Sequence, residues 1–367
     1  MTEEQEDILS LFGVPGIGAK TFAKLTGIFG SAGAVFLASD RDLLAVEGIG
    51  PVLLRNLRTL DCKKLVGAQK KIMDKVGAVM LTRHDPDYPP QLNIFPSAPP
   101  VLFVRGDTKA LQLPALAFVG TRKPSSWGVS MTEKLASGAA HAGYCVVSGM
   151  ATGIDSAAHR AALEENGKTA AVFGCGADII YPPENKRLSE EIVRSGCVIS
   201  HFLMGTQCSP GNFPARNAVI VGLSLGTIVV EAPRKSGALI TADLTLRAKR
   251  PLFTVPGNAD SPTSEGTNNL LARGAHPISK IEHIISVLGH SLPPDLHSEK
   301  KVAQAVKHPL PPGLGGQILE TLTGGPLQVE ALCSRLGEPV QNILNELTLL
   351  EMDGFVRQKP GKVFEKN

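Results

Sequence analysis

Short apolar runs that alternate with stretches of helix length most constrain how this chain can fold. The runs are rich in β-branched and small apolar residues, and they fall at 115–119, 144–147, 169–173, 197–200, 227–230 and 251–255. Continuous apolar runs are typical of strands covered on both faces, and their alternation with helices indicates a mostly parallel sheet. We therefore expect an α/β domain over 81–288, with its binding site in the loops that follow the carboxyl ends of the strands.

Residues 1–80 are expected to be all-helical and contain a near-repeat of a tight turn that enters a helix. The turns, 15–18 and 47–50, both end in Gly-Ile-Gly and resemble a helix-hairpin-helix motif (a SAM-like domain) present twice. Such glycines leave amides free at a helix start, where they can hold a phosphate without reading sequence. The alternative is a helical scaffold whose turns only pack the helices. Residues 81–100, in which prolines recur, look like a linker into the main domain.

The end of the chain predicts a second small domain. Residues 289–314 are a proline-rich linker, and 315–367 read as three short helices followed by a hairpin, which is the pattern of a winged helix. A winged helix can bind DNA through its second or third helix and its wing. Because this segment has a net charge of −2, a protein-contact or dimer-supporting role is the alternative.

Composition and charge exclude several classes of protein. The net charge is +3, so a polyanion would have to bind through local basic patches. The six cysteines show no CxxC spacing, which argues against a zinc ribbon and favours buried thiols in a reducing compartment. The chain does not begin like a signal peptide, and its longest uncharged apolar run, 218–230, is too short to span a bilayer. We expect a soluble, cytoplasmic protein with no membrane partner, no metal and no cofactor.

The first candidate loop follows the run at 115–119. Gly120 lets the backbone turn sharply, and Thr121 and Arg122 come next, just before a helix-length segment. Arg122 should then lie at the sheet edge beside a helix N-terminus, where a phosphate binds well. The alternative is that Arg122 forms a surface ion pair.

The second candidate loop begins with Ser148 and Gly149 and ends at Asp155. It is a further strand–turn–helix with free amides, and Asp155 suits the N-cap of the helix. The loop lacks the GxGxxG and Walker patterns, so by itself it is weak evidence for a phosphate site. His159, on the following helix, is interpreted as a packing residue rather than a catalyst.

The third candidate loop runs from 174 to 186. Asn185 and Lys186 open the helix that follows it, and Lys186 brings a positive charge to that helix start. Tyr181 is interpreted as a packing residue, with base stacking as the alternative.

The fourth candidate region has two parts. Phe213, Arg216 and Asn217 belong to a Phe-Pro-x-Arg-Asn sequence, and Ser236 and Gly237 stand between a strand and a helix, where they again present backbone amides.

These loops, in this order, resemble the bacterial DNA-processing protein A family. The similarity rests on VGTR, SGMATGIDSAAHRAAL, FGCGADIIYPPENKRL, FPARN, EAPRKSGALITA and VPGNADSPTSEGTNNLLARGA, which together span about 115–277. Each motif is weak alone, but the ordered set is highly specific. The chain departs from the family pattern at Ala218, where a third polar residue is usual, and at His201, where an acid is usual, so no role is carried over to either.

The resemblance implies an extended Rossmann-like parallel sheet core between a double helix-hairpin-helix domain and a winged helix. It also implies binding of single-stranded DNA, a homodimer, and delivery of the strand to RecA recombinase in natural transformation, with single-strand-binding protein as a further candidate partner. Arg122 and Lys186 match basic positions that look like contacts to the strand backbone. The other residues around the implied pocket are Gly120, Thr121, Ser148, Gly149, Asn185, Phe213, Arg216, Asn217, Ser236 and Gly237.

A second class of function stays open beside the non-catalytic one. The fold also resembles nucleotide-processing phosphoribohydrolase-like proteins, which carry a PGGxGTxxE signature with an acid placed for glycosidic cleavage. This chain lacks the signature, and Glu231 has no partner carboxylate nearby in the sequence. We therefore expect a DNA-binding protein that is not an enzyme and has no catalytic residues.

Overall fold

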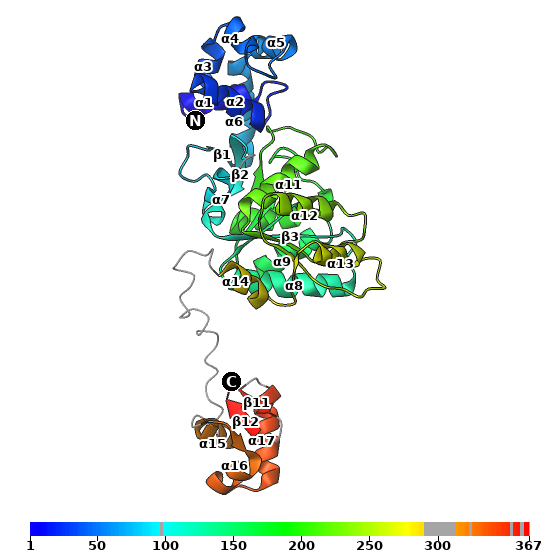
Figure 1. Cartoon of the computed structure of the whole chain (residues 1–367). Helices are drawn as coiled ribbons and strands as arrows, with labels where there is room; N and C mark the ends of the chain where they lie inside the picture. The colour runs from blue at the N-terminus through cyan, green and yellow to red at the C-terminus, as the bar shows by residue number, and fades with distance from the viewer. Residues whose placement is uncertain (96–97, 290–312, 323–324, 353–354, 360–362, 367) are drawn as a thin grey trace. The chain divides into compact units, whose positions relative to one another are not determined.

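The computed structural model describes residues 1–95, 98–289, 313–322, 325–352, 355–359 and 363–366. It divides into two compact units, Met1–His297 and Ser298–Asn367, and the first contains both a helical segment and an α/β core (Figure 1). The predicted fold class is confirmed: a mostly parallel sheet forms the core of the first unit, and a winged helix forms the second.

Within the described residues, the core is a nine-stranded sheet with the order β1-β2-β6-β5-β4-β3-β7-β8-β9. Its parallel part consists of β3 (Ala115–Val119), β4 (Cys145–Ser148), β5 (Thr169–Val172), β6 (Cys197–Ser200), β7 (Gly226–Val229), β8 (Leu252–Thr254) and β9 (His276–Pro277). Each apolar run found in the sequence forms one of these strands. Parallel pairing brings the carboxyl ends of β3, β4, β5 and β7 to one edge of the sheet.

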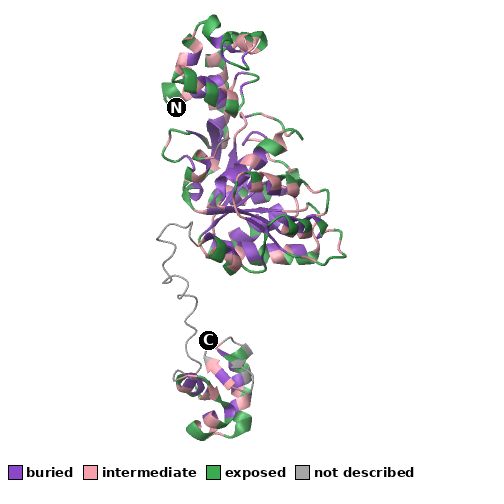
Figure 2. Cartoon of the chain, in the orientation of Figure 1, coloured by how far each residue is buried: buried purple, intermediate pink, exposed green. Residues whose placement is uncertain are grey.

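The strands are continuously apolar because both of their faces are covered (Figure 2). Along β3, Ala115 and Ala117 pack with α11, whereas Leu116 and Phe118 pack with α8 and α9 on the other face. Successive side chains of a strand point to opposite faces, so a strand between two helical layers needs apolar residues at every position. The helices of the core are α8 (Ser126–His141), α9 (Ile154–Glu164), η2 (Pro183–Asn185), α10 (Lys186–Ser195), α11 (Asn212–Leu223), α12 (Gly237–Arg247), α13 (Glu265–Ala272) and α14 (Ile281–Leu288).

The helical segment shows the two equivalent turns that the near-repeat predicts. Its helices are α1 (Glu3–Phe12), α2 (Ala19–Phe29), α3 (Ala32–Leu37), α4 (Asp40–Leu44), α5 (Pro51–Thr59) and α6 (Cys62–Val76). Gly16 and Gly48 have φ values of +99° and +91°, and Gly18 and Gly50 are the N-caps of α2 and α5. A positive φ is cheap only for glycine, which explains why both turns carry it at the same position.

Residues 81–100 are not a linker, so that expectation was wrong. β1 (Ala78–Thr82) and β2 (Val101–Gly106) add an antiparallel pair to the sheet beside β6, and α7 (Pro90–Asn93) lies between them. Tyr88 is 3% exposed and its hydroxyl donates to the Pro99 carbonyl at 2.6 Å, while Leu92 is completely buried. The prolines therefore shape a packed connection, because apolar side chains between them reach the core.

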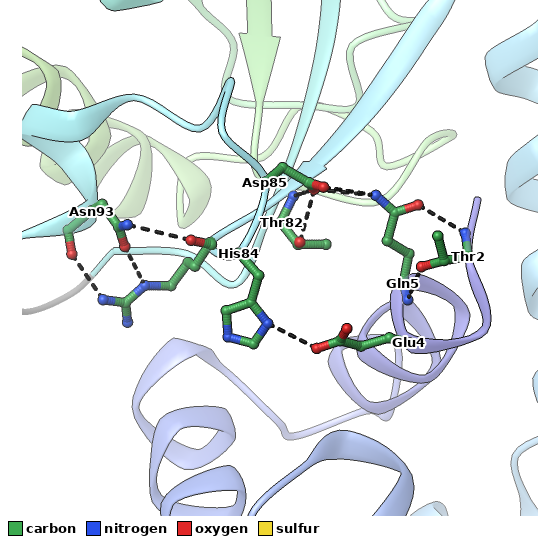
Figure 3. A network of polar contacts seen from close by, with 8 residues as sticks. Thr2, Glu4, Gln5, Thr82, His84, Asp85 and Asn93 are labelled. Atoms are coloured by element: carbon green, nitrogen blue, oxygen red, sulfur yellow. Dashed lines mark hydrogen bonds and ion pairs between the residues drawn. The ribbon is translucent and has the colours of Figure 1, made fainter.

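A polar network ties α1 to the turn after β1 (Figure 3). Gln5 Nε2 donates to both carboxylate oxygens of Asp85 at 3.1 Å, and Asp85 also accepts from the Thr82 amide at 2.6 Å. His84 Nδ1 lies 2.9 Å from a carboxylate oxygen of Glu4. These contacts, with an apolar core that the helical segment shares with β2, join the two parts of the first unit.

The second unit has the predicted helices and hairpin. They are α15 (Leu314–Thr321), α16 (Val329–Leu336), α17 (Val340–Met352), β11 (Val356–Lys359) and β12 (Val363–Lys366), together with a short strand, β10 (Leu327–Gln328), that the sequence did not suggest. β12 pairs with both other strands, and the hairpin turn, 360–362, lies outside the described residues. An apolar core that includes Ile318, Leu347 and Phe364 holds the unit together.

Among the helices that the structure describes, none is long and apolar enough to cross a membrane.

If 81–100 is part of the core, shortening one of its buried side chains should destabilise the whole first unit. Leu92→Ala is expected to lower the free energy of unfolding by about 2–5 kcal/mol, because it leaves a cavity among buried neighbours. Ile94→Ala is the matched control, since Ile94 is 78% exposed and its loss should change stability by less than about 0.5 kcal/mol. Urea unfolding followed by circular dichroism measures both, and equal effects of the two variants would contradict the packing described here.

Candidate functional site

Two adjoining cavities lie at the carboxyl edge of the sheet, one of about 400 Å³ and one of about 230 Å³. We call them the larger and the smaller edge cavity. Both are lined by Arg122, Ala151, Phe213 and Arg216, so these side chains form the boundary between them. The loops after β3 and β4 and the start of α11 therefore meet there, as the parallel topology predicts.

A cavity of about 700 Å³ between α1, α2 and the 83–100 segment is larger but suits an anion less well. Its lining includes Glu3, Glu4 and Asp7, whose negative charges repel a phosphate. The two edge cavities are therefore the better candidate for binding a nucleic acid.

Phe213 is the centre of the edge site. The guanidinium carbons of Arg122 and Arg216 each lie 5.6 Å from the centroid of its ring, and the ring of Tyr181 lies 6.5 Å away. Two cations over one aromatic ring make favourable cation–π contacts. An aromatic face beside fixed positive charges can take a nucleobase and its phosphate together.

Arg122 and Lys186 are both exposed on this edge, and neither forms an ion pair within the described ranges. Arg122 therefore does not form the surface ion pair that was its alternative. Lys186 begins α10 directly after η2, whose Glu184 lines the smaller cavity, but Lys186 itself lines neither cavity. The structure thus places Arg122 in the site and Lys186 outside both cavities, two residues after Glu184.

Several amides around the start of α8, those of Thr121, Ser125 and Gly128, are already bonded within the protein, in contrast to the expectation for the first loop. Glu231, which is 1% exposed, accepts the Ser125 amide at 2.8 Å through its carboxylate and the Thr121 amide at 2.8 Å through its carbonyl. A side chain at Gly128 would collide with the same carboxylate. Glu231 therefore holds both ends of the loop that carries Arg122, and its charge stabilises the helix N-terminus.

The amides of the second loop are occupied as well. Asp155 was expected to be the N-cap of α9, but Gly153 has that position, and Asp155 instead accepts the amides of Gly149 and Ala151 at 3.2 Å each. Burial raises the pKa of Asp155, and the charge of Arg216 opposes this rise. The carboxylate of Asp155 therefore occupies two amides of this loop that a phosphate could otherwise bind.

Arg216 is a buried cation at the ends of β4 and β5. It is 6% exposed, and its Nη1 donates to the carbonyl oxygen of Gly149 and, at 2.9 Å, to that of Val172. Its Nε donates to the side-chain oxygen of Asn217 at 3.1 Å. A Cβ atom at Gly149 would collide with the guanidinium, so a side chain there would displace it. Arg216 therefore acts mainly on the shape of the site.

Ser148 and Asn185 lie outside both cavities and use their polar atoms within the protein. The Ser148 hydroxyl, fully buried, donates to the Phe118 carbonyl at 2.6 Å. Asn185 Nδ2 donates to the Met150 carbonyl at 2.8 Å and to the Ser156 hydroxyl at 2.9 Å. Both side chains connect neighbouring loops rather than face the site.

The start of α12 also lies at this edge, where the Ser236 hydroxyl caps the helix by accepting the Ala238 amide at 3.3 Å. Ser236 and Gly237 line the larger cavity, and a Cβ atom at Gly237 would meet no other atom within 4 Å. The first turn of α12 contains no acidic residue. Lys235, which sequence reasoning missed, lines the same cavity; a cation directly before a Ser-Gly helix start is the signal that could have revealed it.

The remaining residues to place are Gly120, Thr121 and His201. Gly120 lies against Ile154 and the Glu231 backbone, and Thr121 accepts the Lys123 amide through its hydroxyl at 3.2 Å. His201, one of the two departures, has a pKa lowered to about 4, chiefly by burial, and is therefore neutral at pH 7. It supplies neither the missing acid nor a cation.

The prediction for His159 is confirmed. The residue is fully buried and its Nδ1 lies 2.6 Å from the Thr169 hydroxyl, so it packs α9 against β5. Within the described parts of the chain, no three His, Cys, Asp or Glu side chains are grouped so as to hold a metal ion.

Comparison with known proteins identifies the chain. A family model for DNA recombination-mediator protein A matches residues 79–289, and a model for the DprA winged helix domain matches residues 304–362. The chain belongs to the DNA recombination-mediator protein A family. The resemblance seen in the loop motifs is thus confirmed over the whole α/β core and the tail.

Relatives of this family are similar over most of their length. Protein Smf of Synechocystis sp. is 36% identical over 70% of this chain and 74% of its own length, and Protein Smf of Escherichia coli is 36% identical over 75% and 74%. The crystal structure of DNA processing protein A from Streptococcus pneumoniae covers 78% of this chain and 98% of its own, with a TM-score of 0.67 and 31% identity. A Helicobacter pylori relative, described for its single-stranded DNA binding mode, covers 59% and 97%, with a TM-score of 0.53 and 32% identity.

The different surroundings of the two arginines predict different effects of their replacement. Arg216→Met should lower the free energy of unfolding by about 2–4 kcal/mol, because it leaves buried carbonyls unpaired and Asp155 without a nearby cation. Arg122→Met should change it by less than about 0.5 kcal/mol, since the side chain is exposed. Denaturant unfolding of both variants measures the difference, and a fully stable Arg216→Met protein would contradict the buried role.

Proposed function

We propose that this protein is a single-stranded DNA-binding recombination mediator, which protects incoming strands and loads RecA recombinase onto them in natural transformation. The observation that carries the proposal is Phe213 between Arg122 and Arg216, at the boundary of two cavities of nucleotide size. We propose that it works in the cytoplasm as a homodimer and without catalysis. The published description of single-stranded DNA binding by the Helicobacter pylori relative supports the choice of ligand.

The chemistry of the edge site suits a single strand better than a duplex. Arg122, Lys186 and Lys235, with the N-terminus of α12, provide positive charge for phosphates, and Phe213 and Tyr181 provide faces on which bases stack. A base can stack on the face of an aromatic ring that lines a cavity only when it is unpaired. None of these groups selects one base over another, so we propose binding with little sequence preference.

Two basic side chains of the helical segment are paired with acids, so this segment offers less positive charge to DNA than its sequence suggests. Lys24 forms an ion pair with Glu47 at 2.8 Å, and Arg58 pairs with Asp40 at 2.9 Å. These contacts favour the alternative in which the glycine turns pack the helices. We propose that residues 1–80 act chiefly as a scaffold attached to the 81–288 domain.

The winged helix is proposed as a protein-contact module joined through the 289–314 linker. Its third helix, α17, contains Glu346 and Glu351 and no basic residue, so it does not present the positive surface that a DNA-reading helix needs. Residues 315–367 would then bind a protein partner, for which RecA, single-strand-binding protein and a second copy of the chain are the candidates.

The larger cavity also keeps open the second candidate, a nucleotide-processing enzyme of phosphoribohydrolase type, because a mononucleotide phosphate would fit beside α12. The carboxylate of Glu231 does not support this candidate, since it is buried and engaged with Ser125. We expect no free base when the protein is incubated with the common nucleoside monophosphates, as measured by liquid chromatography. Release of a base that Glu231→Gln abolishes would replace the proposed function by the enzymatic one.

The proposed phosphate contacts can be tested by salt dependence. The double variant Arg122→Ala/Lys186→Ala should bind single-stranded DNA more weakly, and the slope of log affinity against log salt should fall by about 1.4, at about 0.7 per phosphate contact. Thermal melting should hardly change, because exposed charges contribute little to folding. Titration of a labelled oligonucleotide at several salt concentrations measures the slope.

A matched control removes two cations from the opposite edge. Lys109 follows β2 and Lys249 precedes β8, so both lie at the amino edge of the parallel strands, and both are exposed. Lys109→Ala/Lys249→Ala should leave the slope nearly unchanged. Equal slopes in the two double variants, or tighter binding of a duplex of the same length than of the single strand, would refute the proposed site.

A further inference from the structure

The tryptophan of this chain is exposed at the edge where the site lies. The sequence contains one tryptophan, Trp127, which is the second residue of α8 and is 43% exposed. A tryptophan side chain contributes most to stability when it is buried, and large exposed aromatic rings are enriched where proteins bind partners. Its place in the fold therefore needs an explanation other than core packing.

The Glu231 contacts hold Trp127 close to Arg122. Ser125, the N-cap of α8, donates its amide to Glu231, and Gly128, which follows Trp127, packs directly against the same carboxylate. Trp127 is five positions after Arg122, so their Cα atoms lie at most about 18 Å apart. A strand of a few nucleotides can span that distance.

The surroundings of Trp127 suit a base and its phosphates. Within the described part of the chain, no aromatic ring or cation lies over the indole. Lys123 precedes it on the Arg122 loop, and Lys134 lies seven residues further along the same face of α8, about 10 Å along the helix axis. Both lysines are exposed, and no ion pair in the described ranges includes them.

We propose that Trp127 is a stacking platform for a nucleobase of single-stranded DNA that leaves the edge cavities past Arg122. The proposal rests on the proposed function and extends it, because it gives the strand a direction: from Phe213, across the Arg122 loop, onto the start of α8. Stacking on an indole tolerates every base, which agrees with binding that does not read sequence. Lys123 and Lys134 neutralise the phosphates on either side of the stacked base.

Because the chain has a single tryptophan, its intrinsic fluorescence reports on this side chain alone. We expect saturating oligothymidylate of about ten nucleotides to quench the emission of the full-length protein. A dinucleotide that occupies only the edge cavities should leave the emission nearly unchanged. The Arg122→Ala/Lys186→Ala variant should show the same quenching at saturation, but only at higher oligonucleotide concentration.

Three substitutions separate stacking from charge and from general surface effects. Trp127→Ala should weaken binding of the longer oligonucleotide about tenfold, which corresponds to about 1.4 kcal/mol, and should leave the salt slope unchanged because no cation is lost. Trp127→Phe should restore most of the affinity, since it keeps an aromatic face. Ile94→Ala, which removes a side chain that is 78% exposed and lies outside both edge cavities, should bind as the wild type does.

The outcomes distinguish this proposal from the proposed function. The stacking role is overturned if Trp127→Ala binds with the wild-type affinity and the longer oligonucleotide, at saturation, does not quench the emission of the wild-type protein. A weakened Arg122→Ala/Lys186→Ala protein would still support the edge site. Emission that changes with protein concentration in the absence of DNA identifies Trp127 as a contact between copies of the chain and likewise overturns the proposal. If neither set of substitutions affects single-strand binding, the proposed function itself fails.

Discussion

The buried guanidinium of Arg216 is the interaction on which the edge of this sheet depends. It donates to the carbonyl oxygens at the ends of β4 and β5, where a parallel sheet leaves acceptors without a strand partner. Burying a cation is costly unless its donors are satisfied and an opposite charge is near, and Asp155 supplies that charge. Glycine at position 149 leaves room for the same contact, because the guanidinium occupies the space that a Cβ atom would take.

The protein uses its own carboxylates to close the amide clusters that glycine-rich loops create. Glu231 occupies the start of α8, and Asp155 occupies the loop after β4. A ligand therefore does not have to organise these loops when it binds, which lowers the entropic cost of binding. The positive groups that remain available are side chains on a rigid frame, above all Arg122, together with the N-terminus of α12 beside Lys235.

Much of the fold could be predicted because it depends on local pattern. Each apolar run became a strand, and both glycine turns lead into helices as expected. The 81–100 segment was misread because its prolines are a strong local signal for a loop, whereas the burial of Tyr88 and Leu92 depends on helices and strands far along the chain. The loops that line the edge cavities could be predicted as a group, since parallel strands must bring their following loops to one edge, although Ser148, Asn185 and Lys186 line neither cavity.

The sequence alone determined that these loops would lie at one edge, because the alternation of apolar runs and helices indicates parallel strands. Only the tertiary structure decided what each polar residue does within those loops. Ser125 and Glu231 are 106 positions apart, and Gly149 and Arg216 are 67 apart. No local pattern in the sequence therefore shows that the members of each pair form a hydrogen bond. Whether a glycine loop offers its amides to a ligand or gives them to a distant side chain depends on packing in three dimensions.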